Sequence, residues 1–377
     1  MLVEITKESL MNALQHVIKA VAVNSPLPVL QGINIEVGIE DVRFTASNTS
    51  MTIQFKIPSD GASVTIMRAG AIVIPSRYFY EVVRKLNDEM VVLEVREQMI
   101  LLITSGHSNI RLCGMDPADF PQMVTGEDHS KGKLQLNNAL FKSTIKQVAV
   151  VASTSETRPI LTGVSFKYQN DCLNLIATDG VRLASRNLHI ERKGYTNFNF
   201  NSIVPARNLY EVSKMVTDTD EVIEIEVSEK RVRFTTNRLR VESALIEGTF
   251  PSIKNVIPQS YLSEIFVDKV CLLRAVECVT VIASESIISL VATADTLKLL
   301  SRTSEIGDIE NEVPFLEMSG EEFKISLNGK LFIDILRSCD CSKFRLRYAG
   351  KTKPIVVLPD ESPVSTLFLI TPVRTHD

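Results

Sequence analysis

The sequence predicts an α+β protein of three repeated domains, each with two helices packed on antiparallel strands. Three observations support this prediction. Segments recur at a spacing of about 130 residues, helical segments carry apolar residues three and four positions apart, and the segments between them alternate apolar and polar residues. The length of 377 residues is sufficient for three domains of ordinary size.

The repeat is clearest between the first two copies. Three pairs of segments carry it: residues 25–33 with 156–164, residues 74–82 with 204–212, and residues 120–121 with 250–251. The offset is 131 for the first pair and 130 for the other two. Three landmarks at one spacing indicate duplication of a structural unit.

A third copy is fainter. Val267 to Ala283 has the helical pattern of Leu136 to Ala152, and Leu327 to Ile335 occupies the position of a later helix start without its prolines. Polar or proline-marked connections at Thr125-Gly126-Glu127-Asp128 and Ile257-Pro258-Gln259-Ser260 separate the copies. The expected domains are residues 1–128, 129–257 and 258–377.

Each copy is expected to begin with an amphipathic helix. In the first copy the helix spans Ile5 to Val21, and in the second it includes Phe141 and Ala152. Both place apolar residues on one stripe, formed by Leu10, Leu14, Val17 and Val21 in one copy and by Phe141, Ile145, Val148 and Ala152 in the other. This face should pack on a sheet.

Strands and a second helix follow. Alternation predicts strands at residues 32–37, 173–177, 222–227 and 232–234. A second helix is expected from Pro75 to Leu86 and from Pro205 to Met215, each with proline near the first turn, where its missing N–H has no helical partner to lose. Each copy is thus two halves of a helix and strands, which gives six halves in the chain.

Composition is that of a globular protein, with 45% hydrophobic and 23% charged residues. Fibrous, collagen-like and disordered classes are therefore excluded. No apolar run approaches the ~18 residues that cross a bilayer, and Glu4, Lys7 and Glu8 interrupt the N-terminus where a signal peptide needs an apolar core. We expect a cytoplasmic protein without membrane contacts.

Sequence chemistry gives no sign of an enzyme. The five histidines have no metal-like spacing, and neither a phosphate-binding loop nor a GxGxxG motif is present, so neither a metal nor a cofactor is expected. The six cysteines suggest no disulfide framework and should be reduced and mostly buried. Cys339-Asp340-Cys341 is better read as two ordinary thiols in a loop than as a redox pair.

Charge is distributed unevenly between elements. The net charge of the chain is −4, but the six predicted helices sum to +7, so the remainder carries −11. Basic helices on an acidic body are suited to phosphate contacts that do not read sequence. Since Lys and Arg are also good helix formers, solvated helix faces remain the alternative.

A ring would favour the phosphate interpretation. Six helices about 10 Å wide that line a closed ring leave a hole of only ~9 Å, which is too narrow for a duplex. Twelve helices from two chains leave a hole of roughly 28 Å. A head-to-tail dimer that closes on itself would supply them, because such contacts must form a ring or else polymerise.

In its motifs the chain resembles the bacterial sliding clamps, the beta subunits of DNA polymerase III, over its whole length. The motifs that carry the resemblance are Leu27-Pro28-Val29-Leu30, Arg158-Pro159-Ile160-Leu161-Thr162-Gly163-Val164, Ala177-Thr178-Asp179-Gly180-Val181-Arg182-Leu183-Ala184, Gly248-Thr249-Phe250-Pro251 with Val256-Ile257-Pro258, and Ile370-Thr371-Pro372-Val373-Arg374. Their combination in this order is specific, although each is weak alone.

The resemblance implies a ring-shaped homodimer of three-domain subunits that encircles duplex DNA and tethers polymerase for processive synthesis. It also implies a pocket between the second and third domains for short peptides from the polymerase III catalytic subunit, the clamp loader and repair factors. The pocket residues would be Leu161, Thr178, Gly180, Val181, Arg182, Leu183, Pro251, Val256, Ile287, Asn328, Pro354, Ile370, Pro372, Val373 and Arg374.

The same resemblance implies two further surfaces. Arg77 and Arg207 match positions that face DNA, and charge and helix placement add Arg84, Lys85, Lys142, Lys146 and Lys214. The subunit contact would involve Ile110 and Leu112 from the first domain and Val281 and Ile282 from the third.

Three positions in or beside the pocket depart from the family pattern. Val181 stands where His is common, Ser252-Ile253 where Asp-Tyr follows Phe-Pro, and Asn255 where a basic residue is usual. We therefore expect the tethering role with altered partner preference, as in a secondary clamp copy. The open alternatives are an ordinary hairpin turn at Asp179-Gly180, a simple C-terminal strand at Ile370 to Val373, and a repeat scaffold that binds only proteins.

Overall fold

The computed structural model describes residues 1–121, 123, 130–190, 198–217, 222–253, 255–303, 306–360 and 365–374. The predicted connection at Thr125 to Asp128 lies outside these residues. The described residues form six α-helices, which are α1 (Lys7–Val17), α2 (Ser76–Lys85), α3 (Asn138–Ala149), α4 (Ala206–Met215), α5 (Lys269–Thr280) and α6 (Gly329–Ser338). Each predicted repeat therefore contains two helices, as expected.

The chain divides into two compact units. Unit 1 comprises Met1–Asn138 and Lys214–Leu245, and unit 2 comprises Ala139–Ser213 and Ile246–Asp377. The second repeat is shared between them, because its strands pair with those of both neighbours. The boundaries of the sequence repeats therefore differ from those of the two compact units.

Unit 1 contains two antiparallel sheets. The five-stranded sheet has the order β5 (Val64–Arg68), β1 (Leu2–Thr6), β7 (Met90–Arg96), β8 (Ile100–Ser105), β9 (Ser108–Cys113). The eight-stranded sheet has the order β10 (Gly132–Asn137), β15 (Val222–Val227), β16 (Arg231–Thr235), β17 (Leu239–Ala244), β4 (Met51–Pro58), β3 (Asp41–Ser47), β2 (Gly32–Val37), β6 (Gly70–Pro75).

Unit 2 also contains two antiparallel sheets. The nine-stranded sheet has the order β14 (Phe200–Pro205), β11 (Gly163–Gln169), β12 (Cys172–Thr178), β13 (Arg182–His189), β26 (Ser365–Ile370), β25 (Ile355–Pro359), β24 (Lys343–Tyr348), β18 (Ser263–Asp268), β22 (Phe315–Gly320). The four-stranded sheet has the order β21 (Gly307–Val313), β20 (Leu297–Thr303), β19 (Ile287–Ala292), β23 (Phe323–Asn328).

Repeats are joined by main-chain pairing of strands. In unit 1 the last strand of the second repeat, β17, pairs with the fourth strand of the first, β4, so that Val241 lies opposite Ile53. In unit 2 the last strand of the third repeat, β26, pairs with the fourth strand of the second, β13, so that Phe368 lies opposite Ala184. A sheet that continues across a boundary leaves no unpaired edge there.

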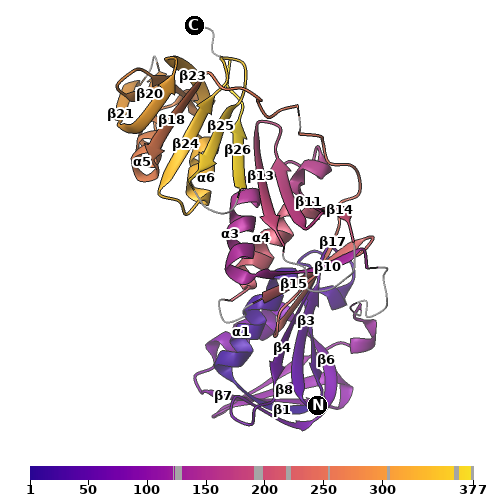
Figure 1. Ribbon diagram of the computed structural model, residues 1–377. Coiled ribbons are helices and arrows are strands. Elements are labelled where there is room, and N and C mark those ends of the chain that lie inside the picture. The colour runs from indigo at the N-terminus through magenta and orange to yellow at the C-terminus, as the bar shows by residue number, and fades with distance from the viewer. Residues whose placement is uncertain are drawn as a thin grey trace. The chain divides into compact units, whose positions relative to one another are not determined.

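The helices pack on the sheets through the predicted apolar stripes. Leu10, Leu14 and Val17 of α1 are fully buried, and α1 contacts α2, β3 and β4 within unit 1. In unit 2, α5 contacts α6 and β21, and α6 contacts β26 (Figure 1). In α3, Phe141, Ile145 and Val148 are buried as predicted.

Side chains cap three of the helices that lack proline at their start. Thr6 caps α1, since its hydroxyl oxygen accepts the Ser9 N–H at 3.3 Å. Asp268 caps α5 by accepting the Cys271 N–H at 2.9 Å, and Asn328 caps α6 by accepting the Leu331 N–H at 3.1 Å. Pro75 occupies the capping position of α2, as the sequence predicts.

Three expectations were wrong in detail. The first helix begins at Lys7 rather than Ile5, because Leu2–Thr6 forms β1 with Ile5 buried in the sheet. Its α-helical part ends at Val17, and Ile18–Ala20 forms a 3₁₀ turn. The cysteines are free but not mostly buried, since Cys113, Cys271 and Cys278 are exposed.

Helix length and apolar character decide whether a helix could cross a bilayer. Among the helices of the described residues, none has the length and apolar character needed to traverse a bilayer.

Candidate functional site

The loop between β12 and β13 is a tight turn held by Asp179. One carboxylate oxygen of Asp179 accepts the N–H groups of Val181 at 2.9 Å and Arg182 at 2.8 Å. The Gly180 N–H donates to the Thr178 hydroxyl at 3.1 Å, and Gly180 has a φ of 94°, in the region that favours glycine. The predicted Asp179-Gly180 turn is therefore present, and it fixes the start of β13.

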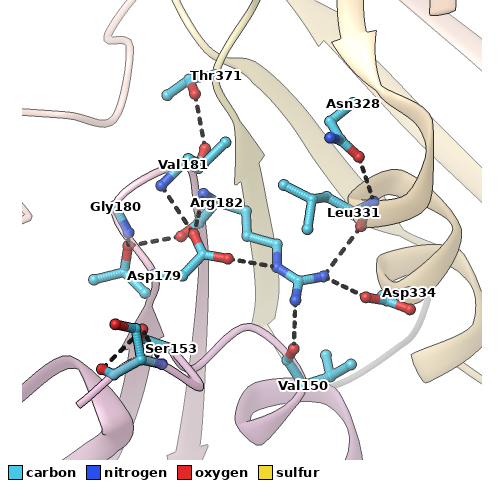
Figure 2. A network of polar contacts seen from close by, with 12 residues as sticks. Val150, Ser153, Asp179, Gly180, Val181, Arg182, Asn328, Leu331, Asp334 and Thr371 are labelled. Atoms are coloured by element: carbon cyan, nitrogen blue, oxygen red, sulfur yellow. Dashed lines mark hydrogen bonds and ion pairs between the residues drawn. The ribbon is translucent and has the colours of Figure 1, made fainter. Parts of the chain in front are cut away.

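Arg182 connects this turn to two other segments (Figure 2). Its Nε donates to Asp179 at 2.9 Å, Nη1 donates to Asp334 at 2.9 Å and to the Leu331 carbonyl at 3.3 Å, and Nη2 donates to the Val150 carbonyl at 2.9 Å. Asp334 and Leu331 belong to α6, and Val150 follows α3. Because the Arg182 side chain is only 8% exposed, these acceptors compensate a buried charge.

The surroundings of Arg182 refine the role that the resemblance implies. Its guanidinium is engaged with two carboxylates and two carbonyls, so it joins the second repeat to the third. The side chain therefore fixes the geometry of the turn and of α6. Its hydrogen-bond donors are engaged by acceptors of the chain itself, unlike those of an arginine that is exposed for ligand binding.

The C-terminal tail continues the same junction. Ile370 ends β26 and is fully buried. Thr371 then donates both its N–H and its hydroxyl to the Val181 carbonyl, each at 2.9 Å, as Figure 2 shows for the side chain. The Val373 N–H donates to the Ser326 carbonyl of β23 at 2.8 Å. The tail thus spans from the turn to the four-stranded sheet.

An apolar cluster lies beside the turn. Leu183, Val356 and Leu369 are its buried members, and the partly buried residues packed on it are Ile176, Ile253, Ile257, Tyr261, Leu358 and Leu367. The segment after Pro251 therefore lies against the sheet through Ile253 and Ile257. Ile253, one of the departures from the family pattern, is a packing residue here.

Several predicted pocket residues come together around this junction. Val181, Arg182 and Leu183 meet Leu369 to Thr371 through strand pairing and the tail. Ile287 lies opposite Asn328 in the β19–β23 pair, and Ile355, which follows Pro354, lies opposite Ile370. Val181 is 41% exposed and Val256 is 43% exposed, so both present aliphatic surface to solvent.

Other predicted pocket residues are in the same unit but are less closely connected. Leu161 is buried in the 3₁₀ turn Pro159–Thr162, whereas Pro251 and Arg374 are exposed. Within the described part of the chain, Leu161, Pro251 and Val256 make no hydrogen bond to the turn at 178–182. Pro372 and Val373 are half-buried.

The predicted DNA-facing residues are mostly exposed on helices. Arg77, Arg84 and Lys85 on α2, Lys146 on α3, and Arg207 and Lys214 on α4 are exposed, whereas Lys142 is half-buried. Arg84 pairs with Glu81 at 2.7 Å, and Lys146 pairs with Asp340 at 2.7 Å. The hydrogen bond from Arg84 holds the pKa of Glu81 below its usual value.

The predicted subunit-contact residues lie on an edge strand of unit 1 and just after a helix of unit 2. Ile110 and Leu112 are half-buried on β9, an edge strand of the five-stranded sheet in unit 1. Val281, which follows α5 in unit 2, is 80% exposed, and Ile282 is half-buried. Apolar residues at these two positions are available to another chain.

Metal-ligand chemistry has no counterpart in the described ranges, since no group of three or more His, Cys, Asp and Glu side chains there could hold an ion. His129 and His376 lie outside the described residues.

Comparison with known proteins gives the family. Models of the DNA polymerase III beta subunit match in order: the N-terminal domain at residues 1–124, the central domain at 135–252 and the C-terminal domain at 254–374. The chain belongs to the DNA polymerase III beta subunit family. This membership confirms the resemblance and the α+β architecture of three clamp domains. The predicted limits at 128 and 257 stay predictions.

Individual relatives of this family match along their full lengths. The beta sliding clamp of Bacillus subtilis (strain 168) is 32% identical over 380 residues, which is 99% of each chain. The beta sliding clamp of Staphylococcus aureus (strain COL) is 33% identical, again over 99% of each chain. The crystal structure of the DNA polymerase sliding clamp from Bacillus subtilis covers 100% of both chains with a TM-score of 0.93 and 32% identity.

Sequence reasoning missed part of this beta-subunit junction. Asp334, Leu331 and Val150 carry the contacts of Arg182, yet none was a candidate. Their separations from Arg182 of 152, 149 and 32 residues exceed any local pattern. Thr371 was quoted within a motif, but only the fold shows that its hydroxyl reaches the Val181 carbonyl.

Proposed function

We propose that this chain is a sliding clamp that encircles duplex DNA as a head-to-tail dimer and tethers a DNA polymerase for processive synthesis in the cytoplasm. The observation that carries this proposal is the match of all three beta-subunit domains, in order, across the chain. It acts as a processivity factor and contributes no catalytic group of its own.

Ring closure follows from the strand junctions. The last strand of one repeat pairs with the fourth strand of the preceding repeat at β17–β4 and at β26–β13. The last strand of the first repeat, β9, and the fourth strand of the third, β21, are both sheet edges. Pairing of β9 in one copy with β21 in another would repeat the same junction and close the ring.

Side chains at these two edges support the pairing. Ile110 and Leu112 of one copy would meet Val281 and Ile282 of the other. Arg111 lies between the apolar residues of β9, whereas β21 carries Glu310 and Glu312, which share the single ammonium group of Lys298 at 2.8 Å and so keep a net negative charge. Opposite charges on the two edges favour their association and its orientation.

The DNA contact is electrostatic and independent of sequence. Arg77, Lys85 and Arg207 are exposed on helices, where they can interact with DNA phosphates across a layer of water. Because retention on DNA depends on encirclement, the dimer should remain on circular DNA and slide off a linear molecule at its ends.

Partner proteins would bind the junction of unit 2. Its exposed aliphatic residues Val181 and Val256 and the tail at Pro372 and Val373 could seat one or two apolar side chains of a short peptide. The polymerase III catalytic subunit and the clamp loader would provide such peptides. With Val181, Ser252-Ile253 and Asn255 as the departures from the family pattern, we propose altered partner preference, as in a secondary clamp copy.

Two measurements test the proposal. Sedimentation with small-angle scattering should give a dimeric annulus of twice 41.9 kDa. After loading, the protein should stay on nicked circular DNA and be lost when a restriction enzyme opens the circle. An elongated monomer without retention would instead support the scaffold that binds only proteins.

Partner preference needs its own titration. A generic clamp-binding peptide should bind this chain more weakly than it binds an ordinary clamp, and Val181→His should strengthen that binding. Equal affinity for both clamps would contradict altered preference while leaving the tethering function intact.

A further inference from the structure

The basic side chains predicted to face DNA differ in their local partners. Arg84 and Lys146 each have a carboxylate oxygen at 2.7 Å, from Glu81 and Asp340. Arg77, Lys85 and Arg207 form no salt bridge within the part of the chain that the structure describes. The basic helix faces therefore contain positions already neutralised by the protein itself.

The paired carboxylates are held in place. Glu81 is one helical turn before Arg84 on α2. Asp340 follows α6, and its neighbours Cys339 and Cys341 are 0% and 9% exposed, which anchors the backbone on both sides. The Asp340 side chain is itself 71% exposed, so it points to solvent from a fixed position beside Lys146.

These pairs contribute little to folding but matter for phosphate binding. Exposed ion pairs are nearly balanced by hydration and side-chain entropy. A free lysine beside DNA releases a condensed counterion, and this release drives binding. A lysine beside a tethered carboxylate cannot release that carboxylate, and a phosphate must displace it or accept a repulsive neighbour.

We propose that Asp340 and Glu81 act as tethered counterions that weaken the grip of Lys146 and Arg84 on the DNA backbone. The proposal rests on the proposed clamp function. It assigns these carboxylates to the tuning of phosphate affinity, so that the closed ring holds DNA by topology while its inner contacts stay weak enough for sliding.

Salt dependence of DNA binding tests this assignment. The full chain is titrated against a short labelled duplex at several KCl concentrations, and binding is followed by fluorescence anisotropy. Asp340→Asn should make the slope of log K against log[salt] more negative by up to ~0.9 for each lysine freed. Glu81→Gln should act in the same direction through Arg84.

A matched control separates local from general charge effects. Lys133 pairs with Glu224 at 2.7 Å, but this pair joins β10 and β15 in a sheet. Glu224→Gln removes the same charge and should leave the slope unchanged. If Glu224→Gln and Asp340→Asn change it equally, net charge explains the effect and the proposal is wrong.

A second variant makes the test reciprocal. Lys146→Gln should change the slope little in the unaltered chain, because Lys146 is already neutralised there. In the Asp340→Asn background it should remove the added slope. Equal losses in both backgrounds would overturn the proposal. Since Asp340→Asn is expected to strengthen binding, misfolding cannot imitate the result.

Failure of the clamp function gives a different outcome. If the unaltered chain shows no salt-dependent DNA binding, the proposed function itself fails. If it does, but Asp340→Asn and Glu81→Gln leave the slope unchanged, only the tethered-counterion proposal fails.

Discussion

The two junctions between repeats share a turn but differ in charge. At the start of β4, Asn48 accepts the N–H groups of Ser50 at 3.2 Å and Met51 at 2.9 Å. Asp179 makes the same contacts to Val181 and Arg182, 131 positions later. Asn48 and Met51 thus correspond to Asp179 and Arg182.

The end of the last strand of the next repeat, β17 or β26, also docks on this turn in the same way at both junctions. The Ala244 N–H donates to the Ser50 carbonyl at 2.8 Å, as the Thr371 N–H does to the Val181 carbonyl. Only in unit 2 does a charged side chain reach from the turn into the next repeat. Main-chain pairing therefore builds both junctions, and the Arg182 network with its tail makes one of them a candidate binding site.

The largest expected effect comes from making the second junction resemble the first. Arg182→Met copies Met51 but leaves the carboxylates of Asp179 and Asp334 without their partner. We expect a loss of about 3 to 5 kcal/mol in the free energy of unfolding of unit 2. Urea denaturation of the full chain, followed by hydrogen exchange in β13 and β26, measures it.

A double variant provides the control. Asp179→Asn with Arg182→Met reproduces the Asn48 and Met51 pair and should recover part of the loss, since Asp334 is 46% exposed and can be hydrated. A single variant as stable as the unaltered chain would show that Arg182 is not needed to hold the junction.

The next effect concerns the junction proposed between two copies. Ile110→Asp places a carboxylate where the apolar residues of β9 would meet Val281 and Ile282, so the dimer should weaken by about a hundredfold, or about 2.7 kcal/mol. Sedimentation velocity measures the dissociation constant. Met67→Asp on β5, the opposite edge of the same sheet, is the control because Met67 is 52% exposed. Similar weakening by both would argue against β9 as the contact.

A smaller effect is expected from the tail. Thr371→Val removes the hydroxyl contact to Val181 and leaves only the N–H contact that Ala244 makes in unit 1. We expect a loss of about 0.5 to 1 kcal/mol in tail stability and a few-fold weaker peptide binding. Amide exchange at Val373 and peptide titration measure these changes, with Thr296→Val as a control in the β19–β20 turn. Unchanged exchange and affinity would show that the hydroxyl has no role in the tail.

The smallest effect distinguishes the helix caps of the first and third repeats. Because the Cys271 N–H donates to Asp268, the pKa of Asp268 lies below its ordinary value of 3.8. Its contribution to stability is therefore present above pH 3.8 and is lost as the pH falls through the folded-state pKa.

Asp268→Thr, which copies the Thr6 cap of α1, should change stability by only a few tenths of a kcal/mol at neutral pH, roughly the spread among good caps. It should also remove this part of the acid sensitivity. Thermal unfolding between pH 2.5 and 7 measures both. Equal acid sensitivity of the variant and the unaltered chain would exclude the cap as its source.

Local patterns in the sequence were sufficient for the repeat plan. The Asp179-Gly180 pair after an apolar strand predicted a turn, and the stripe of Leu10, Leu14 and Val17 located a helix, because turns and helix faces depend on neighbouring residues. The short strand at Leu2–Thr6 was missed, since its five residues lead directly into the helix at Lys7 and their alternation is too short to separate the two elements. Three exposed cysteines were misjudged because burial depends on packing.

Long-range contacts lay beyond such patterns. The salt bridge between Arg182 and Asp334 joins residues of different repeats, and Lys146 meets Asp340 only because α3 and the end of α6 are close in unit 2. The sequence therefore placed Lys146 on a basic helix correctly but could not show that it is already neutralised.

Placement of the exposed thiols has a practical consequence for labelling. Cys113 ends β9, and Cys271 and Cys278 lie on α5. A maleimide dye would therefore attach to the elements assigned to subunit contact and to the inner surface, and could disturb both. Protection of Cys113 from alkylation at rising protein concentration would, for the same reason, report ring closure without any added probe.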